Sequence, residues 1–350
     1  MVSFSRTDYS QYGGWAEEST FSAGNVKECH VMLHVSPQGE MFGSQLNRLM
    51  HVFSDYMQNH PDMQVVMRRF FLSDISNQKG LLMQSLKEYG AEKGALSIIG
   101  QPPLDGSKIA LWVYAQNGTS VYSAENQTIT RHNDVEHVWN TNYLSSLKDS
   151  SNQTREILET LESHLEQHGC KLAENCLRTW FYIRDVDTNY KGMVQARCSN
   201  FLVQGLNAKT HYIASTGIGG QPLERESLVQ VDTYSAKGIK PEQISYLYAL
   251  DHLNPTYEYG VTFERGTAVQ YGDRRHLIIS GTASIDNHGR VVHVGDITKQ
   301  AGRMIENVEA LLKEGDATLA DITHIIVYLR DVADYKVIAE TMKQRFPDTP

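Results

Sequence analysis

The stretch "SGTAS" at residues 280–284 places small residues directly after an apolar run, an arrangement suited to binding an anion. Gly281, Thr282 and Ala283 would bring backbone N–H groups against a ligand carboxylate, because small side chains let the backbone approach closely. The alternative is an ordinary tight turn at the end of a strand. The first interpretation predicts that this stretch forms part of a substrate-binding cleft.

Metal chemistry is not expected. His288, His293 and Asp296 follow the spacing H-x4-H-x2-D, which is not a standard metal pattern, and the Gly-containing hairpin explains the first histidine as a loop residue. The four cysteines show no CxxC spacing, so we expect ordinary thiols in a reducing compartment. No phosphate-binding loop or dinucleotide fingerprint occurs, and we expect no cofactor.

Composition excludes several classes of function. The 350 residues are 41% hydrophobic and 21% charged, which is typical of a globular protein with enough apolar material for a core. The net charge is −9 and no basic stripe occurs, so we expect no nucleic-acid binding, although a local basic pocket would still bind a small anionic metabolite. No apolar run is long enough to span a membrane, and residues 1–15 show no secretion signal, so we expect a cytoplasmic protein.

One phrase recurs along the chain and indicates internal repetition. Tyr-aliphatic-Arg-Asp-Val occurs at Tyr182–Val186 and again at Tyr328–Val332, and a fainter form, "FFLSDIS", lies at Phe70–Ser76. Repeats of this kind are evidence for a duplicated structural unit. Because Arg184 and Arg330 are themselves repeated, a structural role is favoured for both.

The residues around these phrases predict a common unit. Apolar residues at helical spacing within 152–176 and 299–323 predict helices, and β-rich runs such as "HIIVYL" (324–329) follow directly. Residues 268–296 read as three strands joined by turns, and a second helix is predicted over about 333–345. The assembled unit is β-β-β-α-β-α-β, a mixed sheet with two helices on one face, which is an α+β architecture.

Three such units divide the chain. We expect a degenerate first repeat over 1–120, a second repeat with a linker over 121–255, and a C-terminal repeat over 256–350. The third repeat lacks its final strands, because the chain reaches "FPDTP" where that part of the sheet should begin. This favours a truncated sequence.

The assembled unit resembles the RidA/YjgF family, also called the L-PSP endoribonucleases. The resemblance rests on "IISGTASID" and on the order of Gly-hairpin, helix with Asn and "IIVYLRDVADY", and it covers residues 265–350 best. Members of this family form homotrimers with a small-molecule site in each cleft between subunits. A chain with three copies is therefore expected to fold as a pseudo-trimer, which predicts a monomer, whereas a cleft shared between chains would require a homo-oligomer. The absence of a basic stripe argues against an RNA substrate.

A narrower resemblance is to the chorismatases, longer relatives that split chorismate into pyruvate and a cyclic carboxylate. It rests on "LRTWFYIRDVDTNYKGM" (177–193), on Ala-x-Thr-x-Ile-Gly-Gly at 214–220, and on "NPTYEYGVTFERGTAV" (254–269). After Asn-Pro, where chorismatases carry a basic or amide-bearing stretch, this chain has Thr256 and Tyr257.

The resemblance implies a set of substrate-binding residues. Arg265 would hold a substrate carboxylate, with Tyr259 and Phe263 beside it, or else it is a solvated cation. Tyr212 and Thr216 would form the opposite wall of the cleft, unless they only pack within a strand.

The sequence departs from the family at the residues that would do the chemistry. Imine deamination in this family uses an Arg to hold the substrate and a Glu to activate water, but the Arg region of the second repeat reads "NAKTHYIAST". Gln230 stands at the position of the Glu, with Asp232 two residues on and on the same side of the strand. The acid that would protonate an enol ether is therefore expected beyond Pro350, and no catalytic residue is assigned.

Three hypotheses follow from the resemblance. The first is a chorismatase-like enzyme that hydrolyses an enol ether, and the second is an enamine or imine deaminase. The third is a non-catalytic protein that binds a small anionic metabolite.

Overall fold

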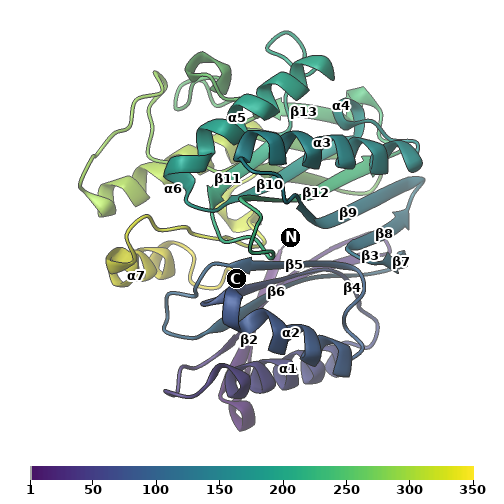
Figure 1. The fold of residues 1–350 in the computed structure, drawn as a ribbon, viewed down its shortest axis with the longest axis vertical. Helices are drawn as coiled ribbons and strands as arrows, with labels where there is room; N and C mark the ends of the chain where they lie inside the picture. The colour runs from purple at the N-terminus through teal and green to yellow at the C-terminus, as the bar shows by residue number, and fades with distance from the viewer. Residues whose placement is uncertain (1) are drawn as a thin grey trace.

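Two six-stranded sheets with the same strand arrangement dominate the computed structural model, which describes residues 2–350 (Figure 1). The first unit contains, in chain order, β1 (Ser3–Tyr9), β2 (Gly14–Ala23), β3 (Val26–Val35), α1 (Phe42–Asn59), β4 (Gln64–Leu72), α2 (Ile75–Glu88), β5 (Ala95–Gly100) and β6 (Ile109–Asn117). The second contains β7 (Ser120–Ala124), β8 (Gln127–His132), β9 (Val135–Leu144), α3 (Ser150–Gln167), α4 (Leu172–Asn175), β10 (Cys176–Ile183), α5 (Val186–Val203), β11 (Ala214–Gly219) and β12 (Val229–Lys237).

The two sheets confirm the predicted repetition. Their strand orders are β1-β2-β3-β6-β4-β5 and β7-β8-β9-β12-β10-β11, so each unit uses its strands in the same sequence. In both, a central strand pairs with one parallel and one antiparallel neighbour, namely β4 with β5 and β6, and β10 with β11 and β12. Helices α1 and α2 cover the outer face of the first sheet, and α3 and α5 cover that of the second (Figure 1).

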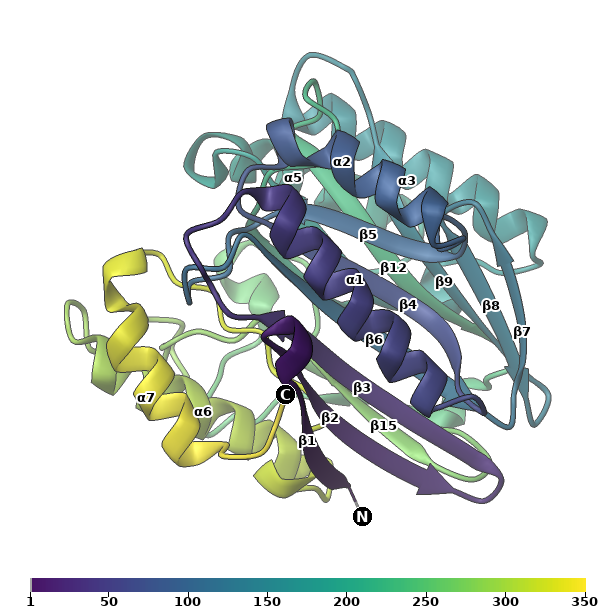
Figure 2. The ribbon, with the colours of Figure 1, turned by 90° about the horizontal axis from the view of Figure 1, so that it is seen from below.

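The third unit is smaller. It contains β13 (Ile244–Leu247), β14 (Gly266–Gln270), β15 (Arg275–Ile279), α6 (Ile297–Glu314) and α7 (Tyr335–Arg345). Figure 2 shows α6 and α7 together on one side of the molecule, away from α1 and α2. Short 3-10 turns lie at Ser10–Tyr12, Pro241–Gln243, Thr256–Tyr259, Leu319–Asp321 and Val332–Asp334.

The prediction of a strand over 324–329 was wrong, because these residues form no strand. This segment corresponds to β4 and β10, but the residues described after α7 form none of the neighbouring strands that those two pair with. Its one backbone anchor among residues 2–350 is the bond from the Ile325 N–H to the Pro350 carbonyl, at 2.9 Å. The third strand predicted within 268–296 is likewise reduced to an isolated bridge between Ile285 and Val291.

Amphipathic helices build the core as predicted. In α3, Ile157, Leu158, Leu161 and Leu165 are all buried against the second sheet, and the Asp149 side chain caps the helix by accepting from the Asn152 N–H at 2.9 Å. In α6, Asn307 is buried, and its side-chain amide donates to the carbonyls of Ala283 and Ile285 at 3.1 Å each. Asn307 thereby fixes the backbone of the "SGTAS" stretch.

The three units contact one another in pairs, which makes a pseudo-trimer. Arg69 of the first unit forms an ion pair with Asp232 of the second at 3.0 Å. Tyr234 of the second unit shares a hydrogen bond with Tyr271 of the third at 2.6 Å. Glu28 of the first unit accepts from the Arg274 Nε at 2.9 Å and pairs with His276, both in the third. The division of the chain at residues 120 and 255 stays a prediction, and β13, placed there with the second repeat, pairs in the third sheet.

Candidate functional site

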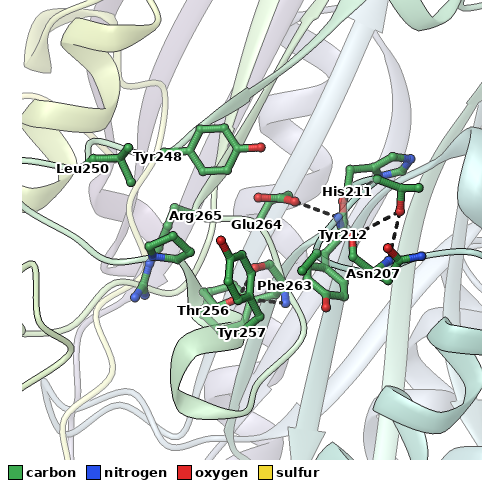
Figure 3. Close-up of a pocket in the computed structure, with 13 residues that line it drawn as sticks. Asn207, His211, Tyr212, Tyr248, Leu250, Thr256, Tyr257, Phe263, Glu264 and Arg265 are labelled. Atoms are coloured by element: carbon green, nitrogen blue, oxygen red, sulfur yellow. Dashed lines mark hydrogen bonds between the residues drawn. The ribbon is translucent and has the colours of Figure 1, made fainter.

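A cavity of about 220 Å³ lies where the second unit meets the third (Figure 3). The second unit contributes the segment between α5 and β11, including His211 and Tyr212. The third unit contributes Tyr248, the loop that starts at Pro255, and residues 263–265 ahead of β14. Aromatic and apolar side chains with a few polar groups are the usual lining of a small-molecule site.

The loop around Thr256 sets the position of residues 263–265. The Thr256 Oγ1 donates to the carbonyl of Phe263 at 2.5 Å and closes the loop on itself. Gly260 ends the intervening 3-10 turn with a φ of 82°, a conformation that favours glycine. The backbone of Glu264 then bridges to β11, because its N–H donates to the Ile213 carbonyl at 3.2 Å. The cavity wall is therefore tied to the edge of the second sheet.

Among residues 2–350, Glu264 is the one carboxyl group that lines the cavity. Its side chain is buried, and its Oε1 accepts from the backbone N–H of Tyr212 at 2.7 Å (Figure 3). Burial raises the pKa of Glu264, and the bond from Tyr212 only partly opposes this effect. No cation pairs with this carboxylate among residues 2–350. A raised pKa widens the pH range in which this carboxyl group carries its proton, which favours a role as a general acid.

Arg265 follows Glu264 and is also buried, but it faces different partners. Its Nε and Nη2 donate to the carbonyl of Asn254 at 3.1 and 2.9 Å, and its guanidinium lies over the rings of Tyr259 and Phe263. In the part of the chain that the structure describes, no carboxylate pairs with it. Its positive charge is therefore not neutralised by the protein.

A second buried cation, Arg197 of α5, lies behind this wall. It donates to the Oγ1 of Thr262 and the Oγ of Ser215, both at 3.3 Å, and its Nη2 has no acceptor within residues 2–350. Tyr259 lies close to both Arg197 and Arg265 and is 43% exposed, so this positively charged region reaches the surface. The arrangement suits an anionic ligand.

The structure brings part of the predicted set together. Arg265, Phe263 and Tyr212 line the cavity, and Tyr259 packs against Arg265. Thr216 lies further along β11, where Gly281 approaches it so closely that a Cβ would come within 3.3 Å of its methyl group.

The "SGTAS" stretch lies outside the cavity. The Gly281 N–H, predicted to face a ligand, donates to the carbonyl of Ser215 at 3.2 Å and is therefore already used. Thr282 donates its hydroxyl to the Ser280 carbonyl, and Ala283 is exposed. A substrate-binding role for Thr216, Gly281, Thr282 and Ala283 stays a prediction.

Sequence reasoning missed Glu264 and Arg197. The signal for Glu264 was its place directly beside Arg265 in "FERG". Asp232, which was considered as an acid, instead pairs with Arg69 and accepts from the Ser97 hydroxyl at 2.6 Å. Its carboxylate is committed to the contact between the first two units.

Residues 2–350 contain no cluster of three or more His, Cys, Asp or Glu side chains placed to hold a metal ion, and His288, His293 and Asp296 do not form one. None of the helices described is both long and apolar enough to cross a membrane.

The chain is similar to known proteins in sequence over part of its length and in fold over most of it. Residues 266–350 match the family model described as Endoribonuclease L-PSP. Over 72 residues the chain is 34% identical to 3-aminoacrylate deaminase RutC of Acinetobacter baylyi, and over 73 residues it is 33% identical to a RutC family protein of Pyrococcus abyssi. These stretches cover 21% of this chain and only 57% and 58% of the two relatives. A crystal structure of a chorismatase matches 93% of this chain and 91% of its own, with a TM-score of 0.62 at 16% identity, which shows a common fold.

Proposed function

Residues 266–350 carry the L-PSP endoribonuclease (RidA/YjgF) family domain in a chain with a chorismatase-like fold, and from this premise we propose that the protein hydrolyses an enol ether of the chorismate type. The products would be pyruvate and a cyclic carboxylate. The observation that carries the proposal is the buried, unpaired carboxyl group of Glu264 in a cavity whose wall also contains a guanidinium without a carboxylate partner.

Glu264 would act as the general acid. Its carboxyl proton is transferred to the terminal CH2 carbon of the enolpyruvyl group, which turns the enol ether into an oxocarbenium ion. Water then adds to the cationic carbon and loses a proton to the Glu264 carboxylate. The resulting hemiketal collapses to pyruvate and the ring alcohol. The acid is regenerated, so no cofactor is consumed.

Arg265 would orient the substrate. A guanidinium holds a carboxylate through two parallel hydrogen bonds, and burial strengthens this interaction because water competes less. Arg197 adds positive charge on the same side of the cavity. The aromatic side chains of Tyr212, Tyr248 and Phe263 would pack against the ring of a cyclic substrate.

The test is pyruvate release from chorismate, followed with a lactate dehydrogenase couple against the spontaneous background. We expect Glu264→Gln to lower kcat/KM by about 10²–10⁴-fold, the usual contribution of a general acid. Arg265→Ala should act mainly on KM, by about 10–100-fold, because it removes a charge-assisted bond to the substrate. The matched control is Glu242→Gln, the same change at an exposed glutamate outside the cavity. No pyruvate above background from the unmodified chain would refute the proposal.

Enamine deamination is the second candidate, favoured by the 34% identity to a 3-aminoacrylate deaminase. The two reactions share the type of their first step, because an enamine is also protonated on carbon, which gives an iminium ion in place of the oxocarbenium ion. Water then adds to the iminium ion and ammonia leaves. Ammonia release from an enamine generated in the assay, with the same dependence on Glu264, would favour this candidate. If neither product forms, plain binding of an anionic metabolite remains.

A further inference from the structure

The interior between the units contains more buried positive charge than negative charge. Arg69 and Asp232 point into it and are 3% and 0% exposed at their side chains. Asp232 has all the partners that it needs, because it also accepts from the Ser97 hydroxyl and from the Asn142 N–H at 2.9 Å. This ion pair is self-contained and leaves no negative charge for a further cation.

Arg178 of β10 is a further buried cation in this interior. Its Nη2 donates to the Thr216 Oγ1 at 2.6 Å, and its guanidinium lies 4.9 Å from the centre of the Trp180 ring. Its Nη1 is buried and has no acceptor within residues 2–350, nor does any carboxylate there pair with it. An unpaired buried charge is strongly unfavourable unless a partner compensates it.

The hydroxyl of Tyr182 also lacks a well-formed hydrogen bond. It is fully buried and has no partner at good geometry among residues 2–350, although the Tyr328 hydroxyl lies close to it. Burial lowers the pKa of Arg178 to about 10, and the hydroxyls of Tyr328 and Tyr182 lie close enough to act on it. The guanidinium of Arg178 reaches Thr216, which pairs with Trp180, and Tyr182 is two residues further along the same face of β10. Two donors, one of them charged, therefore lie on one face of this strand.

The first unit shows that the fold does not need these polar groups. Met67 pairs with Ala95 in the first sheet as Arg178 pairs with Ala214 in the second, so the two residues occupy equivalent positions. By the same register Phe71 corresponds to Tyr182. Both Met67 and Phe71 are buried, so apolar side chains fill the same positions in the same architecture.

We propose that Arg178 and Tyr182 form a buried binding site for a small monocarboxylate, separate from the cavity at Glu264. The guanidinium Nη1 and the phenol hydroxyl supply two donors, and one carboxylate balances the one unpaired charge. Thr216 holds the guanidinium in place from β11. Neither Arg178 nor Tyr182 lines the cavity at Glu264, so the two sites are distinct.

Thermal unfolding of the full chain with sodium acetate tests this site, with sodium chloride at the same ionic strength as the reference. Saturating acetate should raise Tm by about 2–4 °C in the unmodified chain, because it binds only the folded state. Arg178→Met should abolish the rise. Without acetate this variant should be at least as stable as the unmodified chain, since methionine occupies the equivalent position of the first unit. The matched control, Arg155→Met on the exposed face of α3, should keep the rise.

Tyr182→Phe provides a milder variant, because it removes only a hydroxyl that lacks a well-formed hydrogen bond, and it should fold and respond less to acetate. An equal rise in the unmodified chain, Arg178→Met and Tyr182→Phe would overturn the proposal. So would a rise of the same size with chloride, which would indicate an inorganic-anion site. Glu264→Gln should keep the acetate response, so failure of this proposal and failure of the proposed function are distinguishable.

Discussion

At the scale of residues, Glu264 and Arg265 show how one short segment can supply two kinds of chemistry. The side chain of Glu264 ends at the backbone N–H of Tyr212, whereas the guanidinium of Arg265 is held by Asn254 between two rings. Neither charge neutralises the other, although the residues are adjacent. A proton donor and an anion-binding group can therefore coexist at the same cavity wall.

The surroundings of Glu264 predict the effect of pH on stability. Because burial raises its pKa in the folded state, its contribution to stability is present at low pH and is lost as the pH rises through that raised pKa. Glu264→Gln, which resembles the protonated form and can still accept from Tyr212, should raise Tm at pH 8. The difference should vanish below the pKa of an unfolded glutamate, about 4.3. Thermal melts of both chains across this range provide the measurement, and a lower Tm of the variant at pH 8 would contradict the explanation.

At the scale of elements, sequence reasoning was reliable where local pattern decides the outcome. The helical faces containing Leu161 and Ile305 and the recurrence that aligns Tyr182 with Tyr328 follow from spacing alone. The segment 324–329 shows the limit, because its β-rich residues become a strand only if neighbours complete the hydrogen-bond ladder. The site was partly predictable for the same reason. Arg265 stood out by its surroundings in the sequence, whereas Glu264 became significant only once the fold had buried it.

The missing ladder around residues 324–329 predicts a difference in hydrogen exchange. Amides of β4 and β10 are bonded on both sides within their sheets, so they should exchange slowly. Amides of 326–329 have no such partners in residues 2–350 and should exchange at least about 100-fold faster. Peptide-level exchange followed by mass spectrometry compares the segments directly. Equal protection of 326–329 and β10 would show that the segment is paired in solution.

At the scale of the whole molecule, buried charges connect the three units. Glu28 on β3 accepts from Arg274, His276, Tyr114 and Gln116, and the first two belong to the third unit. Asp273, next to Arg274, pairs in turn with His132 of the second unit at 2.7 Å. One turn of the third unit therefore contacts both of the others. The pseudo-trimer depends on this turn as well as on apolar packing.

Glu28→Gln tests how much this connection contributes. Burial alone would raise the pKa of Glu28, but His276 and Arg274 outweigh burial and lower it. Removing the charge leaves Arg274 buried with only Asp273 beside it, so we expect a loss of about 3–5 kcal/mol in the free energy of unfolding at neutral pH. Because the pKa is lowered, the stabilisation is complete above about pH 4.3 and is lost as the pH falls further, so the two chains should converge in acid. Urea unfolding at several pH values provides the measurement.

Glu17→Gln on β2, which removes a surface pair with Arg6, is the control and should cost less than about 1 kcal/mol. Equal losses for the two variants would mean that the units are held together by packing alone.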